Sequence, residues 1–141
     1  MSTAKLLRAY RRLRASRPRE IAFAARAWVL AVPVEASLAA FGLARTLRWI
    51  REIPAGPRRR GAVSVDEGQL LVARAYQLHL LRGQCLPRSL VQYLLHRREG
   101  VAARFVVGVR RADGLDAHAW VEAEGSTNAD GRYAPLLVTE L

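Results

Sequence analysis

Cysteine is almost absent from this 141-residue sequence, which contains a single one, Cys85. A lone cysteine cannot form an intramolecular disulfide, so nothing in the sequence indicates a fold made for an oxidising compartment. We therefore expect a reducing, cytoplasmic environment. An apolar content of 51% in a chain of this length is typical of one folded domain with a sizeable core.

The sequence also lacks a long, uninterrupted apolar run. Residues 21–44 are rich in Ala, Val and Leu, but Arg26, Pro33 and Glu35 interrupt them. A membrane span needs about 20 predominantly apolar residues with few charges. We therefore expect buried or interface helices here, not a signal peptide or a membrane span, with a role at a membrane surface as the less favoured alternative.

Acidic residues are scarce in the first part of the chain. Residues 1–62 hold 14 basic residues against three acidic ones, so the whole net charge of +11 lies there, and residues 63–141 are balanced. Such asymmetry indicates an acidic partner, which could be nucleic acid, an anionic membrane or an acidic peptide or protein. The alternative is a solvated surface in a genome that favours arginine codons, since 22 of the 23 basic residues are Arg.

Proline, glycine and arginine mark a boundary near residue 62. The segment 54–61, Pro-Ala-Gly-Pro-Arg-Arg-Arg-Gly, is typical of a linker or exposed loop. We predict a basic helical region over residues 1–62 and a catalytic core over residues 63–141. In the first region, residues 4–14 and 22–49 are expected to be helical, with a break or kink at Pro33.

The core begins with two predicted helices. Ser64 and Glu67 have the spacing of a capping box, which predicts a helix from there to about Leu81. Gly83 suits the position after its end, and Pro87 suits the first turn of the next helix. That second helix starts near Cys85, ends before Gly100 and has an apolar face made of Leu86, Leu90, Val91, Leu94 and Leu95.

The pattern then changes to that of strands. We predict strands over residues 103–110 and 115–123 joined by a turn at residues 112–114, a short strand from Ser126 and a fourth over residues 133–138. The fold class is therefore α+β, with helices followed by an antiparallel sheet. A three-residue loop at 123–125 is predicted because it would bring Asp130 opposite His118.

Cys85 and His118 are the two residues best suited to act as a nucleophile and its base. A helix N-terminus offers free amides and partial positive charge, which stabilise a thiolate and later an oxyanion. A lone cysteine is more often a small buried hydrophobe, and the histidine decides between the two interpretations. His79 and His96 lie in helical segments, whereas His118 lies in a strand, where an imidazole can serve as the base of a thiol nucleophile.

A third residue must orient the histidine. Asp130 and Asn128 lie on the next predicted strand, while Asp113 and Asp116 are weaker candidates near the preceding turn. Gln84 or Gln77 could add a second oxyanion donor. The sequence has no metal-ligand cluster and no phosphate-binding glycine loop, so we expect no metal and no cofactor.

Three strings carry a resemblance to a known family. Residues 84–90 (Gln-Cys-Leu-Pro-Arg-Ser-Leu), 103–109 (Ala-Arg-Phe-Val-Val-Gly-Val) and 117–122 (Ala-His-Ala-Trp-Val-Glu) resemble the leader peptidase of lasso-peptide biosynthesis. That family belongs to the transglutaminase-like, papain-related cysteine hydrolases. Its order of Cys, His and Asp implies a triad of Cys85, His118 and Asp130, although residues 126–130 match the family less closely. Asn128 therefore stays open as the orienting residue.

The resemblance implies removal of the leader from a ribosomally made precursor peptide. The short chain is similar to the split form of the family, in which a separate small protein binds the leader, and a separate ATP-using cyclase closes the macrolactam. Two other classes stay open. One is a transglutaminase-like acyl transferase with the same triad, and the other is a basic nucleic-acid-binding module, against which the lack of a helix-turn-helix pattern, zinc spacing or aromatic platform argues.

Overall fold

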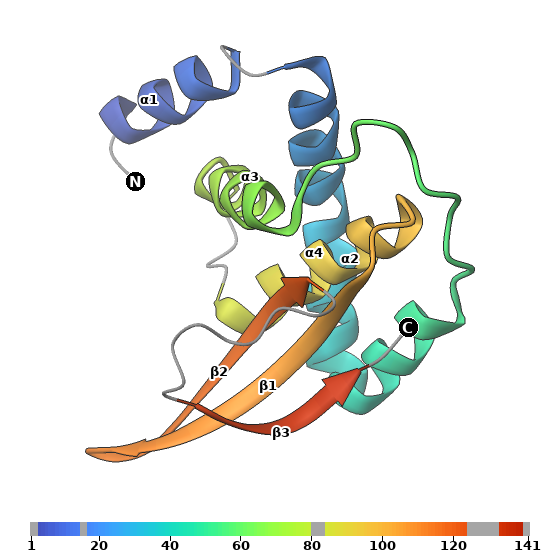
Figure 1. Cartoon of the computed structure of the whole chain (residues 1–141). Coiled ribbons are helices and arrows are strands. Elements are labelled where there is room, and N and C mark those ends of the chain that lie inside the picture. Colours follow the sequence, from blue (N-terminus) through green and yellow to red (C-terminus); the bar gives the residue numbers. More distant parts are fainter. Residues whose placement is uncertain (1–2, 15–16, 80–83, 124–132, 140–141) are drawn as a thin grey trace.

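The computed structural model describes residues 3–14, 17–79, 84–123 and 133–139. Four helices pack on one side of a small antiparallel sheet (Figure 1), so the predicted α+β class is confirmed. The helices are α1 (Thr3–Arg14), α2 (Pro18–Glu52), α3 (Val65–Gln77) and α4 (Cys85–Arg98). The strands are β1 (Ala103–Ala112), β2 (Gly114–Ala123) and β3 (Ala134–Thr139).

The break in α2 lies at Gly42, not at Pro33 as the sequence predicted. Pro33 sits inside the helix, and the non-helical backbone is at Gly42, with φ of 80° and ψ of 176°. Glycine adopts a positive φ without the steric cost of a Cβ, and the helix accommodates Pro33 although its ring crowds the preceding turn and it lacks a backbone donor. Thr46 joins the two halves across the break, because its hydroxyl donates to the Gly42 carbonyl (2.9 Å) and lies 2.7 Å from the Ser37 hydroxyl.

Helix α4 lies at the centre of the molecule. It packs against α2, α3, β1 and β2, and its residues from Ser89 to His96 are all buried. Leu90, Tyr93 and Leu95 are at most 1% exposed, and each fully buried side chain of this size contributes about 2 kcal/mol to folding. The same core contains residues of α2 such as Phe23 and Ile50, so both sides of the boundary predicted near residue 62 meet there.

The start of α3 confirms the predicted serine cap. The Ser64 hydroxyl accepts a hydrogen bond from the Glu67 amide (3.2 Å), and α3 ends at Gln77, four residues earlier than predicted. Gly83, predicted to follow that helix, lies outside the described residues.

The sheet has the strand order β2-β1-β3. The predicted turn at residues 112–114 is confirmed, because Ala112 pairs with Gly114 and His118 pairs with Gly108 in the β1-β2 hairpin. The predicted last strand is also present as β3, which pairs with β1. The strand predicted from Ser126 and the loop predicted at residues 123–125 include residues outside the described part of the chain.

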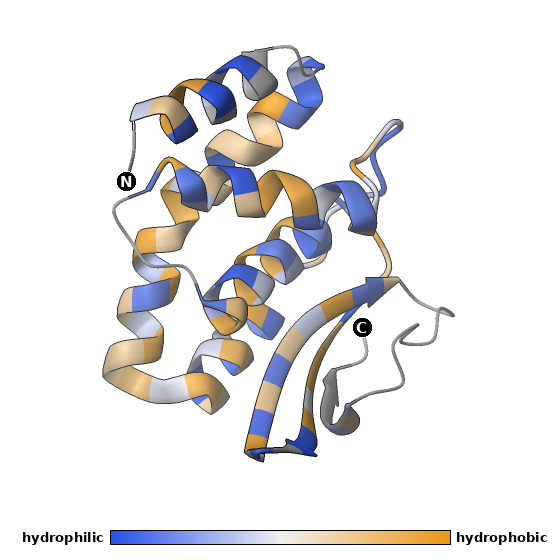
Figure 2. Cartoon of the chain, turned by 90° about the vertical axis from the view of Figure 1, so that its left-hand side faces the viewer, coloured by the Kyte–Doolittle hydropathy of each residue, from blue (hydrophilic) through white to orange (hydrophobic). Residues whose placement is uncertain are grey.

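Hydrophobic residues recur along the whole of α2 (Figure 2), and several of its large side chains are exposed, among them Trp28, Val29 and Val32. By length and composition alone, α2 could cross a membrane. Core helices of soluble proteins and signal sequences pass the same test, so the cytoplasmic location stays a prediction.

Candidate active site

Cys85 is the first residue of α4, as the sequence predicted. The preceding residue, Gln84, is extended, with φ of −77° and ψ of 171°, and its side chain does not cap the helix. The helix starts with the hydrogen bond from the Arg88 amide to the Gln84 carbonyl (3.3 Å). The half-buried Cys85 thiol therefore lies at an uncapped helix N-terminus, where backbone N–H groups and the helix dipole favour negative charge.

His118 lies on β2 within an aromatic cluster. Its ring stacks on Trp120 with the centroids 5.8 Å apart, and the Tyr133 ring lies 5.3 Å away. Gly108, directly opposite His118, leaves the room for this cluster, since a Cβ there would lie 2.7 Å from Trp120 Cη2 and 2.9 Å from Tyr133 Cβ. The Trp120 indole N–H donates to Glu122 (3.3 Å), and His118, Trp120 and Glu122 lie on one face of β2.

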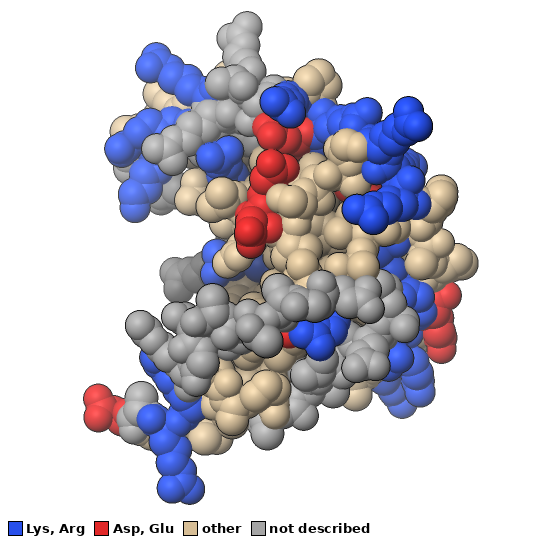
Figure 3. Space-filling model, in the orientation of Figure 1, with Lys and Arg blue, Asp and Glu red and all other residues tan. Residues whose placement is uncertain are grey.

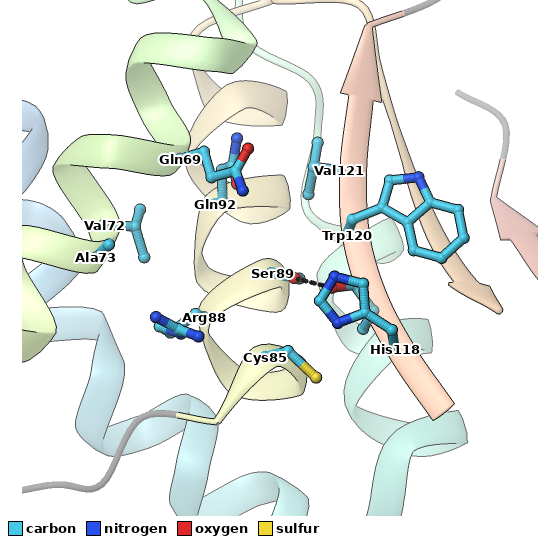
Figure 4. Close-up of a pocket in the computed structure, with 11 residues that line it drawn as sticks. Gln69, Val72, Ala73, Cys85, Arg88, Ser89, Gln92, His118, Trp120 and Val121 are labelled. Carbon is cyan, nitrogen blue, oxygen red and sulfur yellow. Dashed lines mark hydrogen bonds between the residues drawn. The ribbon is translucent and has the colours of Figure 1, made fainter. Parts of the chain in front are cut away.

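The structure brings Cys85 and His118 to one cavity. The cavity has a volume of about 100 Å³ and lies between α3, α4 and β2. Figure 4 shows the Cys85 sulfur on the side of α4 that faces β2, and the His118 ring directed from β2 towards α4. A nucleophile and a base from two different elements thus line the same small space, which is consistent with a thiol activated by an imidazole.

The cavity also contains polar residues of α4 that the sequence analysis did not single out. Ser89 donates to the Ala119 carbonyl on β2 (3.0 Å), and Gln92 donates to the Val65 carbonyl on α3 (2.8 Å). Both residues are buried and line the cavity with Cys85. Their spacing is the missed signal, because residues 85, 89, 92 and 96 fall on one face of a helix. We call Cys85, Ser89, Gln92 and His96 the polar stripe of α4.

The other two histidines lie elsewhere. His96 is fully buried against Phe23, with ring centroids 5.3 Å apart, and burial lowers its pKa from 6.5 to about 4. His79 lies against Trp28, with ring centroids 4.8 Å apart. Both are packed side chains, and neither lines the cavity of Cys85.

Asp130 and Asn128, the two main candidates for orienting His118, lie outside the described residues. Of the weaker candidates, Asp113 is exposed near the tip of the hairpin. Asp116 accepts hydrogen bonds from Arg110 (2.8 Å) and Tyr133 (3.0 Å). The Tyr133 hydrogen bond, followed by that of Arg110, holds the pKa of Asp116 below its ordinary value. Asp116 therefore serves to join Tyr133 to the hairpin.

The two glutamines that the sequence offered as oxyanion donors, Gln77 and Gln84, are placed alike. Gln77 at the end of α3 and Gln84 before α4 are both exposed and do not line the cavity, whereas Gln69 and Gln92 do. Within the described ranges, no three His, Cys, Asp or Glu side chains gather in a way that could hold a metal ion. The cavity therefore combines a thiol, an imidazole and amide side chains, which suits acyl chemistry on a carbonyl group.

One comparison with known proteins is consistent with this chemistry. The family model described as the transglutaminase-like superfamily matches residues 28–138, which is most of the chain and includes Cys85, His118 and the greater part of α2. The comparison with curated proteins found no match, and neither did the comparison with solved structures.

Proposed function

The chain belongs to the transglutaminase-like superfamily, which includes cysteine peptidases, and we propose that it is a peptidase that removes the leader from a lasso-peptide precursor. The observation that carries this proposal is the cavity shared by Cys85 at the start of α4 and His118 on β2. The strings at residues 84–90 and 117–122, which resemble lasso leader peptidases, support the narrower assignment to leader removal.

In the first step, the Cys85 thiolate attacks the carbonyl carbon at the junction of leader and core. The carbonyl π electrons move to its oxygen, and the tetrahedral oxyanion lies at the N-terminus of α4. There the Cys85 amide and the helix dipole stabilise the negative charge. Preorganised donors of this kind lower the barrier because they need no reorganisation during the reaction.

In the second step, the tetrahedral intermediate collapses and the C–N bond breaks. His118, protonated when Cys85 became a thiolate, gives that proton to the departing core amine. The leader stays bound to Cys85 as a thioester. Water, deprotonated by His118, then hydrolyses the thioester, releasing the leader carboxylate and regenerating the thiol. Asp130 is proposed to accept the second imidazole N–H and to hold the ring in the productive tautomer.

The size of the cavity constrains the substrate. A space of about 100 Å³ is too small for a folded domain. The junction is therefore proposed to reach Cys85 as an unstructured peptide, which is the state expected of a short precursor. A separate leader-binding protein is the proposed partner, and a separate cyclase would use the amine that the cleavage exposes.

Product analysis tests this function. The purified chain is incubated with a lasso-peptide precursor and a leader-binding protein, and the products are identified by mass spectrometry. We expect a leader with a free carboxylate and a core with a free N-terminus. A leader joined to an added amine in place of water would identify an acyl transferase with the same nucleophile. Salt-sensitive DNA binding without any thiol-dependent product would instead favour the nucleic-acid-binding alternative.

A further inference from the structure

Two hollows meet at the end of α4 that lies farthest from Cys85. The first, of about 450 Å³, lies between α2 and the segment that follows Pro57, and it contains Arg19, Arg26, Arg59 and Arg60. The second, of about 580 Å³, shares Arg26 and Arg59 with the first and adds Arg98. We call the two together the basic groove.

Positive charge dominates the groove. Glu99 is the one carboxylate among its described lining residues, and it is buried and lies 3.6 Å from Arg26. Arg19 donates to the Arg60 carbonyl. Arg59, Arg60 and Arg98 are exposed, and their side chains have no carboxylate partner in the described part of the chain. Figure 3 shows basic side chains gathered at the upper right, where the start of α2 meets the segment leading to α3. Guanidinium groups without a carboxylate partner are available to bind an anion.

The second hollow also has apolar lining residues. They include Val29, Leu30, Pro54 and Pro57, and Val29 is 62% exposed. Among the described lining residues, neither hollow has an aromatic side chain on which a nucleobase could stack. A groove lined by both aliphatic side chains and guanidinium groups matches a peptide that alternates acidic and aliphatic residues.

The groove is held in place by hydrogen bonds to the end of α4. Gly56 N–H donates to the Arg97 carbonyl (3.1 Å), and Arg59 N–H donates to the Glu99 carbonyl (3.3 Å). The Arg97 side chain donates to the carbonyls of Ile53 (2.9 Å) and Arg51 (2.8 Å). The segment after α2 is therefore fixed to α4, and a ligand does not need to order it on binding.

We propose that the basic groove is an exosite for an acidic and aliphatic segment of the precursor leader, an inference that rests on the proposed function. With a rise of 1.5 Å per residue, α4 places Arg98 roughly 20 Å from Cys85. An extended chain covers that distance with about six residues. Binding in the groove would hold the junction near the thiol and raise its local concentration there.

A binding measurement with matched variants tests the groove. The probe is a fluorescein-labelled peptide, Glu-Leu-Glu-Glu-Leu-Glu, titrated with the full chain and followed by fluorescence anisotropy. The double variant Arg59→Gln, Arg60→Gln should weaken binding about tenfold, and Val29→Ser should weaken it about threefold. The control for charge is Arg45→Gln with Arg48→Gln, which makes the same charge change on α2, outside the groove. The control for the apolar contact is Val32→Ser, which alters an exposed valine outside the groove.

Kinetics with the precursor provide the second measurement. The Arg59→Gln, Arg60→Gln variant should raise KM for the full precursor and leave kcat unchanged, and it should cleave a short junction peptide without a leader as the native chain does. Equal losses in the control variants, or tighter binding of labelled oligothymidine through the same arginines, would overturn the exosite. If the native chain cleaves no precursor but binds the probe through Arg59 and Arg60, leader removal is rejected while the groove is supported as a peptide site.

Discussion

The two ends of α4 differ in size, charge and chemistry. At its first residue, Cys85 shares a cavity of about 100 Å³ with His118 and with amide and hydroxyl side chains. Beyond its last turn, hollows of about 450 and 580 Å³ are rimmed with arginine. One end is narrow and holds a nucleophile, and the other is wide and holds charge.

In the proposed function, bond cleavage and substrate recognition take place at opposite ends of one helix. A small site acts on a peptide bond that resembles many others, so its selectivity has to come from contacts made elsewhere on the substrate. Changes at the Cys85 end should therefore alter turnover, and changes at the Arg98 end should alter the substrate concentration required.

Replacing the nucleophile should separate the two ends most clearly. Cys85→Ala is expected to lower leader removal by at least roughly 1000-fold, because no other thiol exists in the chain. The same variant should bind the labelled acidic peptide as tightly as the native chain, since the groove lies at the far end of α4. The circular dichroism spectrum should be unchanged. Turnover that survives in Cys85→Ala would end the peptidase proposal.

The orienting carboxylate should give the next largest effect. Asp130→Ala is expected to lower kcat about 100-fold with little change in KM, because the imidazole then loses the acceptor that fixes its tautomer. Asn128→Ala, two residues earlier, serves as the matched variant and should lower kcat only a few-fold. Single-turnover rates measure both. If the order of the two effects is reversed, the orienting role passes to Asn128.

Much of the Cys85 end could be predicted from the sequence, because its signals are local. A helix start before Pro87 and a strand pattern around His118 depend on neighbouring residues, and both were correct. The break was assigned to Pro33 because proline is the stronger helix breaker. The helix accommodates Pro33, however, and the non-helical backbone lies at Gly42. The groove could not be predicted, since the arginines after Pro57 meet α2 and the end of α4 only through tertiary hydrogen bonds. In the sequence alone, the same arginines are typical of a linker or exposed loop.

His96, at the far end of the polar stripe, gives a prediction about stability and pH. Burial lowers its folded pKa to about 4, below the ordinary 6.5, so the unfolded chain takes up this proton first as the pH falls. The contribution of neutral His96 is therefore intact above pH 6.5 and is lost progressively down to about pH 4. The free energy of unfolding should be about 2 kcal/mol lower at pH 5 than at pH 7 from this group.

Urea unfolding at the two pH values measures this loss, and His96→Gln isolates it. The variant keeps the other titrating groups. Its free energy of unfolding should therefore fall by about 2 kcal/mol less between pH 7 and pH 5 than that of the native chain. A pH dependence identical in the native chain and the variant would show that His96 is protonated in the folded state more easily than its burial implies.

The smallest predicted effect concerns Ser89, one turn beyond Cys85 on the polar stripe. Its hydroxyl donates to the Ala119 carbonyl, next to His118, and so fixes the spacing of α4 and β2 across the cavity. Ser89→Ala should cost about 1 kcal/mol of stability for the lost hydrogen bond and lower kcat up to about tenfold, because small displacements of a base slow proton transfer. Ser64→Ala is the control. It removes the cap of α3 at a similar cost of about 1 kcal/mol, but Ser64 lies outside the cavity and its loss should leave kcat unchanged. If both variants lower kcat equally, the effect of Ser89 comes from lost stability alone. If only Ser89→Ala does so, the serine positions the base, and the division between the two ends of α4 extends to the residues that support the nucleophile.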